Sequence, residues 1–305
     1  MDKASLTIDR HTPAIPESIW CGLSPSREAL YTTLKNQTIL TAMGLSSTRK
    51  RARKVKPDTS PRCLTDEILG EGIGAYRQVA GKLSPDQFDY LRARGLDESE
   101  MVGFCSTEVL VALLPPETVA NLTLRLPDKL LGFVETTAIT GLTIPYWHGE
   151  VFCGFATRVL NHPQVKYAFS VPNRFCFGVD LSRDEVTVVE GLFDAIAVRR
   201  LGHNPLGMGD SQPNYFKMLV VSKFQKIRLL FDDDLAGWMG VLKAHAILTK
   251  MLGVSEEKIE ICEVGGGHDP EQAVRLGRRD FAVVSMAGAK DRVETWRQWA
   301  FRNRG

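Results

Sequence analysis

Two stretches decide the fold of this 305-residue chain: residues 186–194, VTVVEGLFD, and residues 227–237, IRLLFDDDLAG. Each starts as a short apolar run that is typical of a buried strand, and each ends in acidic residues. Helical patterns closed by a glycine follow at 192–201 and 235–252, and a third strand pattern covers 258–264. Strands that alternate with helices of this length predict right-handed, parallel βαβ units.

Shorter elements extend this pattern. We expect a strand at 205–208 and a helix at 215–224 within the parallel unit, and an amphipathic helix at 287–301 after it. Upstream, alternating apolar residues on both sides of a turn predict a β-hairpin over 142–159. The chain is therefore expected to have an α/β fold, with a Rossmann-like parallel sheet preceded by a smaller α+β unit.

Helical patterns dominate residues 62–133. Ser84 and Pro85 form a helix start signal, and Gly95 is expected to end that helix. A second helix is expected from about Asp97 to Phe104.

Composition and pattern divide the chain into four predicted parts. Residues 1–60 carry ten Lys and Arg against five Asp and Glu, and are expected to be a basic arm, either a solvated linker or a segment that touches phosphates. An α+β subdomain is expected over 61–180, a catalytic domain over 181–275 and a helical segment over 276–305.

The overall composition narrows the class of protein. Hydrophobic residues make up 44% and charged residues 24%, which argues against a mainly disordered chain. No apolar run is long enough for a membrane helix and no signal peptide is visible, so a cytoplasmic protein without membrane contact is expected. None of the six cysteines forms a CxxC pair, so no zinc site is expected.

Acidic residues follow each of the three main strands. They are Glu190 and Asp194, then Asp232 and Asp234, then Asp269. Parallel strands end at one edge of a sheet, so these carboxylates are expected to gather there and to need a cation that offsets their repulsion. Oxygen ligands favour Mg²⁺ or Mn²⁺.

A purely structural interpretation stays open for several of these acids. Asp194 suits the first turn of a helix, where the helix dipole favours an acid, and Asp234 and Asp269 suit N-cap positions. Gly191 leaves room for a substrate or metal to approach the backbone, and the glycines at 265–267 allow a tight loop that returns Asp269 to the cluster.

These acidic motifs resemble the TOPRIM pattern of bacterial DnaG-type and phage primases. The resemblance extends upstream over about residues 83–275, through YLRARGL at 90–96, GFATR at 154–158, VKY at 165–167 and RFCFG at 174–178. It implies a TOPRIM domain preceded by a primase-like N-terminal subdomain. The implied activity is that of a DNA primase, a DNA-directed RNA polymerase that makes short RNA primers on single-stranded DNA.

The resemblance also implies roles for individual residues. Glu190 would be a metal ligand or would accept the proton of the reacting 3′-hydroxyl, while Asp232, Asp234 and Asp269 would hold divalent ions with support from Asp194. Template phosphates or the incoming ribonucleoside triphosphate would meet Arg158 and Lys166, with Gly191 nearby, and Tyr167 would either stack on a base or belong to the core. A replicative helicase or other replication protein is a possible partner.

The sequence departs from the family pattern at several points. Asp233 stands where a glycine is usual, and Leu235 where a basic residue often follows. No N-terminal zinc ribbon and no GxxxxGK[ST] motif is visible, which favours a compact core of the kind found in a phage or mobile element. Two alternatives therefore stay open: a metal-dependent TOPRIM nuclease, and a non-catalytic module that binds nucleic acid during replication.

Overall fold

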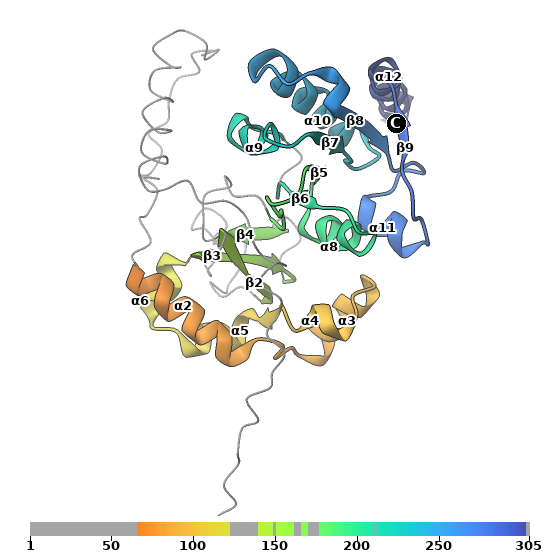
Figure 1. The fold of residues 1–305 in the computed structure, drawn as a ribbon. Coiled ribbons are helices and arrows are strands. Elements are labelled where there is room, and N and C mark those ends of the chain that lie inside the picture. Colours follow the sequence, from red (N-terminus) through yellow and green to blue (C-terminus); the bar gives the residue numbers. More distant parts are fainter. Residues whose placement is uncertain are drawn as a thin grey trace, which may run out of the picture.

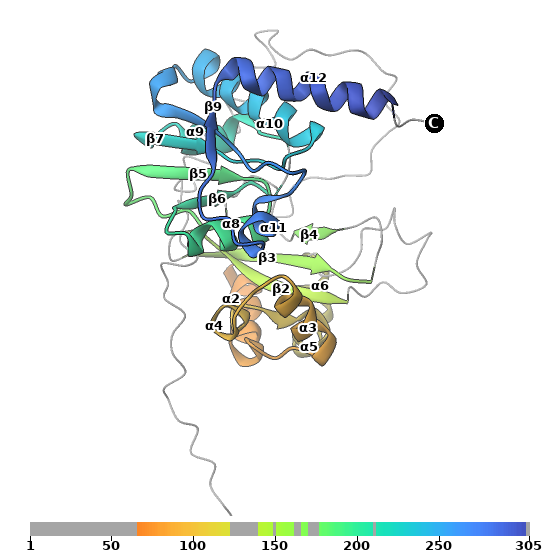
Figure 2. The same cartoon turned by 90° about the vertical axis from the view of Figure 1, so that its right-hand side faces the viewer.

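A computed structural model describes residues 66–122, 140–148, 151–161, 166–169, 177–209 and 212–302. Two sheets lie one above the other, with a layer of helices below the smaller sheet and further helices around the larger one (Figures 1 and 2). The predicted basic arm lies outside the described residues, and the division of the chain at residues 60, 180 and 275 stays a prediction.

Five helices form the layer below the smaller sheet. They are α2 (Asp66–Val79), α3 (Pro85–Ala93), α4 (Glu98–Met101), α5 (Thr107–Leu113) and α6 (Pro116–Asn121). The start signal of α3 is confirmed, because the Ser84 hydroxyl accepts a hydrogen bond from the Gln87 N–H group. The second predicted helix is shorter than expected: α4 ends at Met101, since Cys105 already belongs to a strand.

The smaller sheet is antiparallel, with the order β1-β2-β3-β4. Its strands are β1 (Cys105–Ser106), β2 (Gly141–His148), β3 (Val151–Val159) and β4 (Tyr167–Phe169). The predicted hairpin is confirmed as β2 and β3, in which Leu142 pairs with Arg158 and Ile144 with Ala156.

The larger sheet has the order β6-β5-β7-β8-β9, and its first four strands are parallel, as predicted. The strands are β5 (Glu185–Val189), β6 (Pro205–Gly207), β7 (Lys226–Leu229), β8 (Ile259–Glu263) and β9 (Ala282–Val284). Their helices are α8 (Leu192–Arg200), α9 (Tyr215–Val221), α10 (Leu235–Ala246), α11 (Pro270–Arg275) and α12 (Met286–Arg302). The π-helical turn η2 (Ile247–Met251) follows α10, and the 3₁₀ turn η3 (Glu256–Lys258) precedes β8.

Three details of this half differ from the prediction. Helix α9 ends at Val221 rather than 224, and the predicted helix 235–252 changes to π-helical geometry at Ile247. The antiparallel strand β9 was not predicted, because its three residues are mostly exposed and show no alternation that marks a strand.

One hydrophobic core joins the two sheets. Phe104 and Leu142 of the N-terminal half are fully buried in the same cluster as Val189 and Phe193 of the parallel half. The rings of Phe104 and Phe193 stack with centroids 6.0 Å apart and an interplanar angle of 4°. The two halves therefore pack as one body.

Among the described residues, none of the helices combines the length and apolar character needed to cross a bilayer. Cys105 and Cys262 are buried free thiols.

Truncating the ring that joins the halves is expected to destabilise the whole protein. Phe104→Ala removes a fully buried aromatic side chain and should lower the free energy of unfolding by about 3–5 kcal/mol. Phe104→Leu keeps most of the volume and should cost less than about 1.5 kcal/mol. Urea unfolding followed by circular dichroism measures both; a Phe104→Ala variant as stable as the wild type would show that the ring does not couple the sheets.

Candidate active site

The five predicted acids follow the carboxyl ends of the parallel strands. Glu190 comes directly after β5, Asp232 and Asp234 follow β7, and Asp269 follows β8 at the start of α11. We call Glu190, Asp194, Asp232, Asp234 and Asp269 the acidic cluster.

Asp232 lies at the centre of this cluster. Its backbone N–H group donates to Glu190 Oε1 at 3.4 Å, and its own Oδ1 is buried without a hydrogen-bond partner among the described residues. Burial, followed by the charges of the other four acids of the cluster, raises the pKa of Asp232 from 3.8 to about 9. A cation would relieve both the lost hydration and the repulsion.

Asp194 is held in place by backbone donors. Its carboxylate is almost fully buried and accepts hydrogen bonds from Gly191 N–H at 2.9 Å and from Glu271 N–H at 3.1 Å. Burial and the charge of Asp269 nevertheless raise its pKa to about 6. A Cβ atom at Gly191 would lie only 2.6 Å from Asp194 Oδ2, so this close approach already requires the glycine.

Asp234 and Asp269 are also N-caps. Asp234 Oδ1 accepts from Gly237 N–H at 2.7 Å, and Asp269 Oδ1 accepts from Gln272 N–H at 2.6 Å. The structural interpretation of both residues is thus confirmed, and it is compatible with a second role. A capping carboxylate needs only one oxygen for the helix, and both charges act on Asp232.

Gly237 positions the start of α10 against this cluster, which sequence reasoning missed. A Cβ atom there would lie 2.1 Å from the carbonyl oxygen of Asp232. The glycine in the second acidic motif, LAG at 235–237, was the available signal.

The donor set suits a hard cation, although no finished metal site is present. Among the described residues, no three His, Cys, Asp or Glu side chains are grouped closely enough to hold a metal ion. The partnerless oxygen of Asp232 and the mutual repulsion of the cluster still fit a divalent ion with oxygen ligands. Small side-chain movements would be needed to complete its coordination.

Among the predicted nucleotide-contacting residues, Arg158 lies on β3 and Tyr167 on β4, while Lys166 directly precedes β4. Gly191 is the N-cap of α8. Arg158 Nε donates to the Tyr90 hydroxyl at 3.0 Å, and its guanidinium lies 5.1 Å from the centroid of the Tyr167 ring. Tyr167 is half-buried, and its pKa is raised by burial, with a smaller contribution from Asp194. Lys166 is exposed. Tyr167 therefore packs against Arg158 and lies close enough to the acidic cluster to feel the charge of Asp194.

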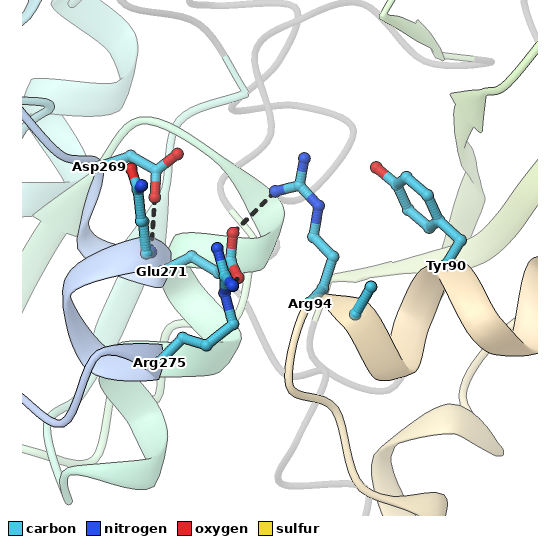
Figure 3. A pocket seen from close by; sticks show the side chains of 7 residues that line it. Tyr90, Arg94, Asp269, Glu271 and Arg275 are labelled. Carbon is cyan, nitrogen blue, oxygen red and sulfur yellow. Dashed lines mark hydrogen bonds and ion pairs between the residues drawn. The ribbon is translucent and has the colours of Figure 1, made fainter.

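A pocket of about 240 Å³ opens beside Asp269, between α3 and α11. It is lined by Tyr90, Ala93, Arg94, Asp269, Glu271, Gln272 and Arg275. Arg94 reaches across to Glu271, with its Nη1 atom 2.8 Å from Glu271 Oε2 (Figure 3). This pair joins residues 177 positions apart, so no local pattern could reveal it.

Glu271 has a second contact on its own helix. Its other oxygen, Oε1, accepts from Arg275 Nε at 3.3 Å, and its pKa is raised mainly by burial. The acid lies in the motif HDPEQ at 268–272, two residues after Asp269, and was not among the predicted site residues. Two arginines thus line a pocket that adjoins the acidic cluster.

The raised pKa values predict a pH dependence of stability in the metal-free protein. Asp194 and Asp232 hold protons more tightly in the folded than in the unfolded chain, so the stability they contribute is complete below about pH 4 and is lost as pH rises through about 6 and about 9. In EDTA, the Tm should fall between pH 5 and pH 8, and Asp232→Asn should reduce that fall. Thermal unfolding by circular dichroism tests this; an equal fall in the variant would contradict it.

Comparison with solved structures identifies the fold. A DNA primase domain from Pseudomonas aeruginosa matches with a TM-score of 0.56 and 18% identity, over 74% of this chain and 78% of that one. The RNA polymerase domain of the Mycobacterium tuberculosis primase DnaG matches at 0.54 and 20%, over 78% and 88%.

The Aquifex aeolicus primase, with its zinc-binding and RNA polymerase domains, matches at a TM-score of 0.53 and 16% identity, over 88% of this chain and 68% of that one. No protein-family model matches the sequence, and neither does any curated protein. The chain has the fold of the catalytic core of DnaG-type primases.

Proposed function

We propose that this chain is a primase catalytic core, which joins ribonucleotides into short RNA primers on a single-stranded DNA template. The observation that carries the proposal is the convergence of the acidic cluster on Asp232 in a chain with this fold. One solved structure of the same fold, matched at a TM-score of 0.53 and 17% identity, is a DnaG primase catalytic domain bound to single-stranded DNA.

Mg²⁺ or Mn²⁺ would be held by Glu190, Asp194, Asp232, Asp234 and Asp269. When bound, it would offset the carboxylate charges and stabilise the attacking and leaving oxygens of a nucleotidyl transfer. In that reaction the primer 3′-hydroxyl attacks the α-phosphate, a new phosphodiester bond forms, and pyrophosphate leaves.

The side chains would share the remaining work. Glu190, which already contacts the backbone of Asp232, would accept the proton of the 3′-hydroxyl or act as a metal ligand. Asp194 and Asp269 would keep the charge density of the cluster in place, because their helix-start contacts restrict their rotamers. The missing side chain of Gly191 would admit the Asp194 carboxylate against the backbone, so the glycine would serve the position of Asp194 and would not leave room for substrate.

Cations and aromatic rings beside the cluster would contact the substrates. Arg158 and Lys166 would bind template phosphates or the triphosphate, and Tyr167 would support Arg158 through its ring. In the pocket beside Asp269, Arg94 and Arg275 would donate further hydrogen bonds to phosphate groups. A replicative helicase or another replication protein remains a proposed partner.

Primer synthesis by the full chain tests this function. With single-stranded DNA, labelled ribonucleotides and Mg²⁺, the wild type should make short RNA, and Glu190→Gln and Asp232→Asn should each lose more than about 100-fold in rate. These substitutions remove a charge but little volume, so the folded state should persist.

Asp184→Asn is the matched control. Like Asp232→Asn, it replaces one carboxylate by an amide of nearly the same size. Asp184 is exposed and precedes β5, so it lies away from the edge of the sheet where the strands end, and the rate should stay unchanged. Equal activity in all four proteins would contradict the proposal. Cleavage of nucleic acid without nucleotides would indicate a nuclease, and DNA binding without metal-dependent turnover would indicate a non-catalytic module.

A further inference from the structure

The second acidic segment carries a third aspartate that the proposed reaction does not use. Asp233 stands between Asp232 and Asp234. Its side chain is only 7% exposed.

Both carboxylate oxygens of Asp233 are occupied by neutral donors. Oδ1 accepts from the Trp238 Nε1–H group at 2.8 Å, and Oδ2 accepts from the backbone N–H of Gly267 at 2.9 Å. The backbone N–H of Asp233 donates to the carbonyl oxygen of His268, also at 2.9 Å. Asp233 therefore contacts two consecutive residues of a loop from another strand.

The glycine loop, residues 265–267, has no side chains of its own that could fix its conformation. Gly265, Gly266 and Gly267 have φ values of 74°, 75° and 72°, and glycine loses more conformational entropy on ordering than any other residue. The loop leads directly into Asp269, the acid at the start of α11. Its conformation thus determines where Asp269 lies relative to Asp232 and Asp234.

We propose that Asp233 is a positioning residue that fixes the glycine loop and thereby holds Asp269 within the acidic cluster. The inference rests on the proposed role of that cluster in binding a divalent ion. It also gives a physical purpose to the aspartate that stands at the usual glycine position. The carboxylate of Asp233 binds the glycine loop and is not a ligand of the metal ion.

Trp238 allows the loop contact to be separated from general packing. Its side chain is 2% exposed, and it binds only the oxygen of Asp233 that does not face the loop. Trp238→Phe removes this donor and leaves the Gly267 contact in place. In a Trp238→Phe background, Asp233→Ala then removes the loop contact without leaving an unpaired indole N–H group.

The experiment measures Mn²⁺ binding and amide hydrogen exchange on the full chain, at a temperature where circular dichroism shows every variant folded. Asp233→Ala, alone or with Trp238→Phe, should weaken Mn²⁺ binding at least about tenfold, as expected for the loss of an outer-shell contact. Exchange at the Gly267 amide should accelerate about tenfold or more in the same two variants. Trp238→Phe alone should stay within about twofold of wild type in both measurements.

Wild-type Mn²⁺ affinity and slow Gly267 exchange in Asp233→Ala would overturn the proposal. So would a loss in Trp238→Phe as large as that in Asp233→Ala, because Asp233 would then act through core packing. If the wild type binds no Mn²⁺, the proposed catalytic function is wrong, and exchange at Gly267 alone decides whether Asp233 fixes the loop.

Discussion

Repulsion among carboxylates at one edge of the parallel sheet is the constraint around which this structure is arranged. Helices α8, α10 and α11 all begin at that edge, and backbone N–H groups at their starts donate to Asp194, Asp234 and Asp269. The positive ends of the helix dipoles therefore offset part of the negative charge. For Asp232, burial and then the charges of the other four acids raise the pKa to about 9, the largest rise in the cluster.

Local periodicity was sufficient to predict most of the elements and the edge at which the acids meet. Strand β5 is a nearly continuous buried run, whereas β7 and β8 mix buried aliphatic residues with partly exposed charged ones. Each strand is followed or preceded by a helix with a clear start or stop signal. From the sequence, Asp194, Asp234 and Asp269 were interpreted either as helix-start residues or as metal ligands. Three-dimensional packing makes them compatible, because capping occupies only part of each carboxylate.

Contacts between distant segments could not be predicted in this way. The Arg94–Glu271 pair depends on how α3 meets α11, and no alternation or spacing along the chain encodes that meeting. The contacts of Asp233 could not be predicted from the sequence either. In the sequence this residue was only an acid at a position where glycine is usual, and its contacts depend on Trp238 of α10 and on Gly267 of the loop after β8.

The hydrophobic cluster shared by both sheets bears on how the molecule can be dissected. Phe193 and Val189 belong to the acidic half, yet their covering side chains come from α3, from β2 and from the turn that holds Phe104. An excised parallel sheet would expose this apolar face to water and would be prone to aggregation. Minimal fragments or grafts of the acidic centre therefore have to carry residues 83–104 and the β2–β3 hairpin with them.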